Sequence, residues 1–234
     1  MKSVEVCLTP ELIHQHDLQG KTAVVVDIFR ATSCMVSGLA AGVRSIYPVL
    51  TVGECLENGK KGMITAGERG GQKLDSFDIG NSPFDYMNKD FKGKRISVTT
   101  TNGTVAINKS KPAREVLIGA FLNLNATLQY LLRKETNIVI HCAGWKGTPN
   151  VEDTLYAGAL IYHLGEAYQI TNDSGLMALN MYEKNAGNMM AAVKNSSHAL
   201  RLQKLGIYKD TAFCMSVDEF NVVVRHEDDH LLKI

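Results

Sequence analysis

Acidic and basic side chains stand close together after two apolar runs in this sequence. Asp27 and Arg30 follow the first Val-rich run, and Glu68 and Arg69 follow a second run. Carboxylates are hard oxygen ligands of the kind that Mg²⁺ prefers, and arginines offer paired donors to phosphate or sulfonate oxygens. Mixed charges at one rim therefore predict a metal ion that works together with a bound anion.

A third acidic position, Glu152 and Asp153, opens a helix that is expected after the run ending near His141. We take Asp27, Glu68 and Asp153 as the candidate ligands of Mg²⁺, the expected cofactor. Each acid also has a structural interpretation, because acids at strand ends often cap helices and acids in a first helical turn complement the helix dipole. The functional interpretation gains weight because these acids would meet at one edge of a sheet.

Segments rich in glycine and hydroxyl groups form a second set of candidates. The turn at residues 100–104, at the start of a helix, offers hydroxyls and backbone N–H groups to an anionic oxygen. Residues 101–103 also fit an ordinary turn, and residues 81–83 fit an ordinary helix start with Pro in the first turn. The candidate substrate-binding residues are Arg69, Gly70, Gly71, Asn81, Thr100, Thr101, Asn102, Gly103, Thr104 and Lys146.

These residues allow two routes for removing a phosphate group, a reaction that depends mainly on positioning and on neutralising charge. In one route, Mg²⁺ lowers the pKa of a bound water, and Glu152 or His141 accepts the proton of that water. In the other, a carboxylate such as Asp27 attacks phosphorus directly. The sequence leaves both routes open. The candidate catalytic residues are Asp27, Arg30, Glu68 and Glu152.

Several known phosphatase and nucleotide-binding signatures are absent. Thr148 and Ala40 stand where a Cys-x5-Arg loop headed by Cys142 or Cys34 would need arginine, and Phe29 replaces the second acid of an Asp-x-Asp motif. The sequence also lacks Gly-x4-Gly-Lys-Ser/Thr, and no strand is followed by Gly-x-Gly-x-x-Gly. These absences disfavour a thiolate nucleophile, an aspartyl-phosphate hydrolase of that type, a P-loop enzyme and a dinucleotide site.

Short Val- and Ile-rich runs alternate with segments of helical period, which is typical of the α/β class. We therefore predict a three-layer α/β/α architecture around a mostly parallel or mixed sheet. Helices are expected at 32–41, 125–134 and 153–166. Strands are expected at 22–28, 45–50, 63–66, 95–100, 115–121, 137–142 and 222–224, and more weakly at 3–8 and 212–215.

Composition narrows the domain organisation and the partners. The chain of 234 residues has 25 basic and 24 acidic residues and no long tract of like charge, so nucleic acid is not an expected partner. No apolar run approaches the ~20 residues of a membrane span. We predict a single domain over residues 1–234, with a helical excursion at 174–205. The oligomeric state is left open, with a homo-oligomer among the alternatives.

The five cysteines are odd in number and widely scattered, without a Cys-x-x-Cys pair. They are expected to be free thiols in a reducing compartment. The first nine residues show no charged-then-apolar pattern of a secretory signal. Together these features predict a cytoplasmic protein.

Taken in order, five blocks of this sequence resemble the 2-phosphosulfolactate phosphatase family. The resemblance implies an α/β fold unlike that of other phosphatases, a requirement for Mg²⁺, and a small anionic phosphorylated substrate. It further implies hydrolysis of (2R)-2-phospho-3-sulfolactate to 3-sulfolactate and phosphate, a step of coenzyme M biosynthesis. The blocks are residues 25–33, 67–71 with 77–83, 99–104, 142–144 with 152–153 and 157–158, and 197–206 with Asp210 and Cys214.

Two positions depart from the expected pattern of that family. Ser76 stands where glycine usually precedes Phe-Asp, and Ala199 and Leu200 replace a Gly-Arg pair after His198. These changes bear on substrate contacts more than on phosphatase chemistry. His198 and Arg201 fall on one face of a short helix, which a solvated surface explains equally well.

Two alternatives to this function stay open. One is a phosphatase that acts on a different small phosphorylated 2-hydroxy acid. The other is a non-catalytic protein that binds an anion or metabolite through the same glycine-rich loops. The carboxylates distinguish them, because a pure anion binder has no use for acids around a negative ligand.

Overall fold

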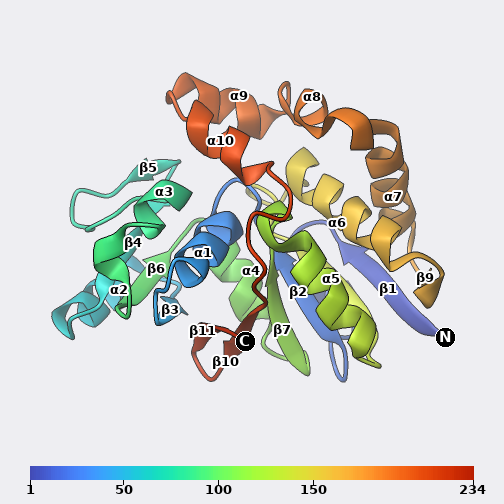
Figure 1. The fold of residues 1–234 in the computed structure, drawn as a ribbon, viewed down its shortest axis with the longest axis horizontal. Helices are drawn as coiled ribbons and strands as arrows, with labels where there is room; N and C mark the ends of the chain where they lie inside the picture. The colour runs from blue at the N-terminus through green and yellow to red at the C-terminus, as the bar shows by residue number, and fades with distance from the viewer.

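The computed structural model describes all 234 residues, and its centre is one sheet of eleven strands (Figure 1). The strand order is β5-β4-β6-β3-β11-β10-β7-β2-β8-β1-β9. Six neighbouring pairs are parallel and four are antiparallel. The strands are β1 (Lys2–Cys7), β2 (Thr22–Val26), β3 (Ser45–Pro48), β4 (Ile64–Arg69), β5 (Gln72–Lys73), β6 (Arg95–Thr99), β7 (Glu115–Gly119), β8 (Ile138–Cys142), β9 (Tyr168–Ile170), β10 (Val224–Glu227) and β11 (His230–Lys233).

Ten α-helices and short 3-10 turns connect these strands. None has the length and hydropathy of a membrane span, and the longest, α6, has 14 residues. The helices are α1 (Ala31–Ala40), α2 (Val52–Lys60), α3 (Pro83–Tyr86), α4 (Gly103–Ser110), α5 (Leu124–Arg133), α6 (Val151–Leu164), α7 (Asp173–Asn185), α8 (Met189–Val193), α9 (Ser197–Lys204) and α10 (Tyr208–Cys214).

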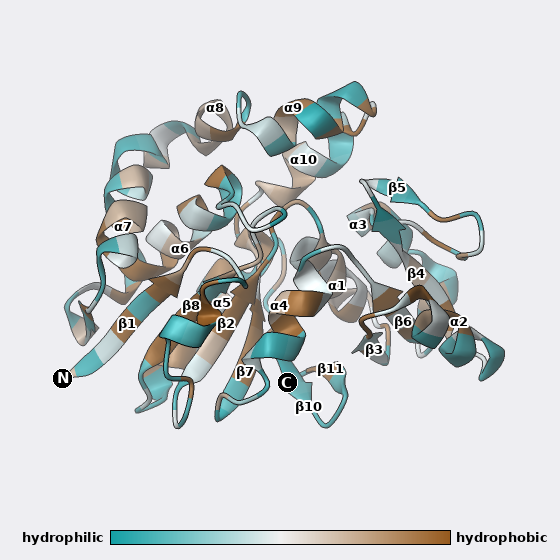
Figure 2. Ribbon diagram, turned by 180° about the vertical axis from the view of Figure 1, so that it is seen from behind, coloured by the Kyte–Doolittle hydropathy of each residue, from teal (hydrophilic) through white to brown (hydrophobic).

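Alternating side chains of the central strand β2 belong to two different apolar clusters. Val24 and Val26 join a cluster of 29 buried residues with side chains of α5 and α6, whereas Ala23 and Val25 join one of 22 that includes α4. Because successive strand residues point to opposite faces, the sheet is covered on both sides. Figure 2 shows the same arrangement, with apolar central strands and polar outer loops. The predicted α/β fold with flanking helices and a mixed, mostly parallel sheet is confirmed.

The main strands and helices lie close to their predicted positions, but the C-terminal part of the chain differs. The weak strand expected at 212–215 is wrong, because these residues fall mainly in α10. The run is short and apolar, a pattern that does not distinguish a strand from a buried helical turn. The strand expected at 222–224 begins only at Val224, and β5, β9 and β11 had no predicted counterpart.

No strand occurs between β9 and β10, and helices α7 to α10 fill that interval. Figure 1 shows this segment rising beside β1 and β9 and then crossing above the ends of the strands, with α9 and α10 over α1. The segment is attached tightly to α6. A Cβ atom added to Gly158 of α6 would lie 2.0 Å from the carbonyl oxygen of Ala178 in α7. Only a residue without a side chain therefore permits this approach of the two helices.

We expect Gly158→Ala to destabilise the protein by at least about 2 kcal/mol, because the new methyl group overlaps backbone that cannot rotate away. Urea unfolding followed by circular dichroism measures the change. Gly187→Ala is the matched control, since a Cβ there meets no atom within 4 Å. Equal stability of the two variants would contradict this account of the α6–α7 contact.

Candidate active site

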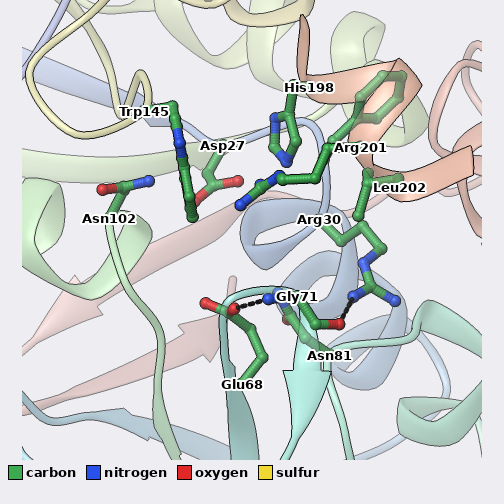
Figure 3. A pocket seen from close by; sticks show the side chains of 11 residues that line it. Asp27, Arg30, Glu68, Gly71, Asn81, Asn102, Trp145, His198, Arg201 and Leu202 are labelled. Carbon is green, nitrogen blue, oxygen red and sulfur yellow. Dashed lines mark hydrogen bonds between the residues drawn. The ribbon is translucent and has the colours of Figure 1, made fainter. Parts of the chain in front are cut away.

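A pocket lies where the loops after β2, β4, β6 and β8 meet helix α9 (Figure 3). Six of its lining residues come from the predicted site, namely Asp27, Arg30, Glu68, Gly71, Asn81 and Asn102. Five others had no predicted role, namely Phe29, Trp145, His198, Arg201 and Leu202. The strand ends and the helical segment thus build the pocket together.

Asp27 directly follows β2 and holds the turn into α1. Its backbone N–H donates to the Thr32 hydroxyl at 3.0 Å, and its Oδ1 accepts a long bond of 3.4 Å from the Ala31 N–H. Its Oδ2 has no hydrogen-bond partner and faces Gly103, where an added Cβ would lie 2.8 Å away. Burial raises the pKa of Asp27 to about 6; nearby His198 lowers it, and Glu68 adds to the rise. This carboxylate therefore has a free oxygen, and a nearby positive charge would stabilise its ionised form.

Glu68 fastens two loops to each other. Its Oε2 accepts from the Gly71 N–H at 2.6 Å, a bond drawn in Figure 3. Its Oε1 accepts from both the N–H and the hydroxyl of Thr101, each at 2.9 Å. Both oxygens are thus occupied, and the side chain fixes the β4–β5 turn against the loop that follows β6.

Asp153 fastens a second pair of loops. Its Oδ1 accepts from the Ile28 N–H at 2.8 Å and its Oδ2 from the Gly144 N–H at 3.0 Å. Burial raises its pKa, and the neighbouring carboxylate of Glu152 raises it further. Because Asp153 is fully buried and does not line the pocket, the structure gives this predicted ligand no free oxygen for a metal.

The predicted arginines are already engaged by protein acceptors. Arg30 donates from Nη1 to Asp210 at 2.6 Å and from Nη2 to the Gly71 carbonyl at 3.0 Å. Arg69 donates to its neighbour's carbonyl at 2.7 Å and to the Thr99 hydroxyl at 3.0 Å, and it does not line the pocket. Both forks therefore stabilise loops in this structure.

Arg201 of α9 is the arginine of the pocket that makes no ion pair or hydrogen bond. Its guanidinium lies over the ring of Trp145, 3.4 Å from the centroid, which holds a cation in place without using its donors. Figure 3 shows it pointing between Asp27 and His198. The three-residue spacing of His198 and Arg201 was the sequence signal for this face, and a solvated surface was the wrong interpretation of it.

His198 and Glu152 form a buried pair, with 2.6 Å between Nδ1 and Oε1. Glu152 has no exposed surface and its Oε2 has no partner. The predicted direct proton acceptor therefore lies behind His198 instead of in the pocket. His141, the other predicted acceptor, is fully buried beside Ser110 at 2.8 Å, and burial lowers its pKa to about 3. It is outside the pocket.

The remaining predicted binding residues surround the pocket without lining it. Thr100 and Thr104 exchange hydrogen bonds at the start of α4, and Gly103 is the first residue of that helix. Gly70 is in the turn before β5 with φ +65°. Lys146 is exposed, with Nζ 5.4 Å from the centroid of the Trp145 ring. Their hydroxyl and amide groups shape the loops around Asp27.

The pocket offers carboxylate oxygens of the kind that a metal ion binds. No group of three or more His, Cys, Asp or Glu side chains is arranged to hold one. Asp27 nevertheless keeps an unbonded oxygen and lines the pocket together with Glu68. Mg²⁺ commonly binds through one or two carboxylates and completes its shell with water and substrate phosphate. The pocket fits Mg²⁺ held in that way by Asp27, and it does not show the predicted cluster of three acids.

Comparison with known proteins places this chain in a family. Residues 7–229 match the family model described as 2-phosphosulpholactate phosphatase. The chain belongs to that family. It is 41% identical over 206 residues to a probable 2-phosphosulfolactate phosphatase of Thermotoga petrophila, covering 87% of this chain and 88% of the relative. A similarly named protein of Caldanaerobacter subterraneus is 37% identical, and the match covers 90% of each chain. One of Clostridium acetobutylicum is 33% identical, and the match covers 98% of this chain and 99% of the relative.

Membership of the 2-phosphosulfolactate phosphatase family confirms the resemblance noted in the sequence and the class of phosphoric monoester hydrolase. The positions that depart from the expected pattern lie outside the pocket lining. Ser76 is exposed in the loop before Phe77, and Ala199 and Leu200 lie between two pocket residues of α9 without lining the pocket. The departures therefore leave the lining of this phosphatase pocket intact.

All five cysteines are buried and free, and none lines the pocket. Burial raises the pKa of each thiol, that of Cys7 to about 11 and that of Cys214 to about 12. Since only the thiolate is a good nucleophile, these side chains are inert at neutral pH. This agrees with the missing Cys-x5-Arg loop.

We expect none of the five thiols to react with 5,5′-dithiobis(2-nitrobenzoate) at pH 8 in the folded protein, because a raised pKa keeps them protonated and burial keeps the reagent out. Absorbance at 412 nm measures the reaction. In 6 M guanidinium all five should react. Rapid reaction of Cys34 or Cys142 in the native protein would revive a thiolate mechanism.

Proposed function

We propose that this protein is a Mg²⁺-dependent phosphatase that hydrolyses 2-phospho-3-sulfolactate to 3-sulfolactate and phosphate. The observation that carries the proposal is the pairing, in one pocket, of a carboxylate with a free oxygen and an arginine with free donors. Family membership supports the substrate, and the unbonded oxygen of the buried Asp27 carboxylate supports the cation. A substrate with several negative charges needs both features.

Asp27 supplies the oxygen that faces the reacting phosphate. When bound, Mg²⁺ would neutralise charge on a phosphate oxygen and lower the pKa of a coordinated water. Glu68 contributes by position, because its three hydrogen bonds hold Gly71 and Thr101 around the pocket. The first turn of α4 starts at Gly103 beside Asp27, so the positive end of this helix lies near the site of a bound anion.

Arg201 binds a substrate anion through guanidinium donors that no protein group uses. Its stacking on Trp145 fixes the plane of the fork, so less side-chain entropy is lost when an anion binds. Arg30 cannot take this part without giving up Asp210, since a broken buried ion pair leaves an uncompensated charge. We therefore assign the binding of the substrate anion to Arg201 of α9 and not to the arginines at the strand ends.

We expect activity to be lost in EDTA and restored by added Mg²⁺, because the free protein places a bare carboxylate opposite the phosphate. Asp27→Asn should lower kcat by several orders of magnitude at every Mg²⁺ concentration if Asp27 is the nucleophile. If it is a ligand, excess Mg²⁺ should recover part of the activity. Phosphate release across a Mg²⁺ titration measures both, with exposed Asp90→Asn as the control. Full activity of metal-free wild type, or of Asp27→Asn, would refute this assignment.

We expect Arg201→Met to raise KM for 2-phosphosulfolactate at least tenfold, because the free cation of the pocket is lost. Arg201→Lys keeps the charge without the planar fork, so its KM should be intermediate. Lys204→Met removes a charge from the exposed end of the same helix and should leave KM unchanged. Other phosphorylated 2-hydroxy acids, assayed in parallel, show whether a different ester is preferred. An unchanged KM for Arg201→Met would remove Arg201 from the anion site.

A further inference from the structure

His198 is held in one orientation by three contacts that come from distant parts of the chain. Glu152 binds its Nδ1 at 2.6 Å. The Trp145 ring stacks on it with 5.8 Å between centroids and 27° between planes, and the edge of Phe29 meets it at 6.0 Å and 72°. The hydroxyl of Ser196, which accepts from the Ala199 N–H at 3.1 Å, caps the helix that carries it. A ring fixed on this many sides cannot turn away from the pocket.

The contact with Glu152 decides which ring nitrogen faces the pocket. The carboxylate accepts a hydrogen bond, so Nδ1 carries hydrogen toward it, and this leaves Nε2 as the nitrogen available to a ligand. Nδ1 makes both hydrogen-bond contacts of the ring, with Glu152 and, at the longer distance of 3.4 Å, with the Asn150 amide nitrogen. Nε2 has no hydrogen-bond partner in the protein, and Figure 3 shows the ring directed into the pocket near Asp27 and Arg201. The Glu152 carboxylate, 2.6 Å from Nδ1, also lies where it can pair with the ring.

The pocket has few other proton donors for a reacting ester. Both oxygens of Glu68 are occupied by loop hydrogen bonds. The guanidinium of Arg201 does not release a proton in proteins. Asp27 is the proposed carboxylate that faces the reacting phosphate and so does not face the leaving oxygen. Among the lining residues, His198 is the one imidazole, and no lysine or tyrosine lines the pocket. The leaving oxygen of a 2-hydroxy acid is an alkoxide, which is a poor leaving group unless it is protonated as the bond breaks.

We infer that His198 is the general acid that protonates the leaving ester oxygen, and that Glu152 is its positioning residue. This inference rests on the proposed phosphatase function. The bond between phosphorus and the ester oxygen breaks, its electron pair goes to that oxygen, and the oxygen takes the Nε2 proton to become a hydroxyl. A water oxygen bonds to phosphorus, either directly or after attack by Asp27. One water proton stays on the phosphate product, and the other returns through solvent to Nε2.

The test compares two phosphorylated compounds, an alkyl ester and an acyl phosphate, that differ in their need for a proton. A 2-phosphorylated 2-hydroxy acid such as 2-phosphosulfolactate releases an alkoxide, whereas acetyl phosphate, which is smaller and lacks the sulfonate, releases a stable carboxylate. With saturating Mg²⁺, His198→Asn should lower kcat for the alkyl ester by about 10²- to 10⁴-fold and for acetyl phosphate by less than about tenfold. His163→Asn, the same change at an exposed position outside the pocket, is the matched control and should leave both unchanged.

Glu152→Gln keeps the shape of the buried side chain and removes its charge. It should reproduce the selective loss on the alkyl ester, and the double variant His198→Asn with Glu152→Gln should be no slower than His198→Asn alone. If Glu152 had a purely structural role, Glu152→Gln would lower kcat for both compounds to the same extent. Circular dichroism of each variant shows whether the fold is retained.

The outcomes separate this inference from the proposed function. Wild type that hydrolyses neither compound refutes the phosphatase itself. Wild type that hydrolyses both compounds, with equal losses in His198→Asn, overturns the general-acid role alone. If wild type hydrolyses only the alkyl ester, addition of imidazole to His198→Ala decides, because a missing proton donor is replaced from solution. Recovery of at least tenfold supports the role of His198, and no recovery overturns it.

Discussion

Buried carboxylates that accept backbone N–H groups from neighbouring loops are the constraint on which this site depends. Asp153 joins the turn after β2 to the turn after β8, and Glu68 joins the turn after β4 to the loop after β6. Parallel strands deliver their carboxyl ends to one edge but leave the loops free to move apart. A carboxylate with two backbone partners fixes the distance between two loops, because both bonds are charge-assisted and shielded from water. The pocket therefore has a rigid floor.

The same constraint explains why acids that lie at similar places in the sequence pattern have different roles in the structure. Asp153 and Glu68 have both oxygens occupied, whereas Asp27 keeps one free. Burial is the main cause of the raised pKa of Asp27, and in this low dielectric the carboxylate of Glu68 raises it further. Asp27 is therefore the acid of this set that keeps an oxygen available to a cation. The acids that fix the loops therefore lie beside the acid that is free to bind a ligand.

Much of the sheet could be predicted from the sequence, because its signals are local. The Val-rich β2 and the helix after it appear within two residues of their expected positions, and the strand-end acids did mark the pocket. What failed depended on long-range contacts. Arg30 looks like an anion clamp until its partner Asp210, 180 positions away, is seen to occupy it. His198 looks like a surface residue until the fold places it against Glu152, 46 positions earlier. Spacing shows which residues share an edge, but not which of their atoms are already bonded.

Two kinds of contact attach helices α7 to α10 to the rest of the chain, and each has its own effect on the functional side chains. Val193, Leu202 and Cys214 are buried in the larger apolar cluster, and their burial supplies most of the stability of the attachment. The ion pairs Arg30–Asp210 and Glu152–His198 add little net stability, because desolvation offsets their attraction. They discriminate between arrangements instead, since any shift of α9 or α10 would leave a buried charge without its partner. An apolar surface alone tolerates sliding, whereas two side-chain pairs that join α9 and α10 to the rest of the chain restrict the position of both helices. Arg201 and His198 therefore reach the pocket with the precision that a site on strand-end loops alone would lack.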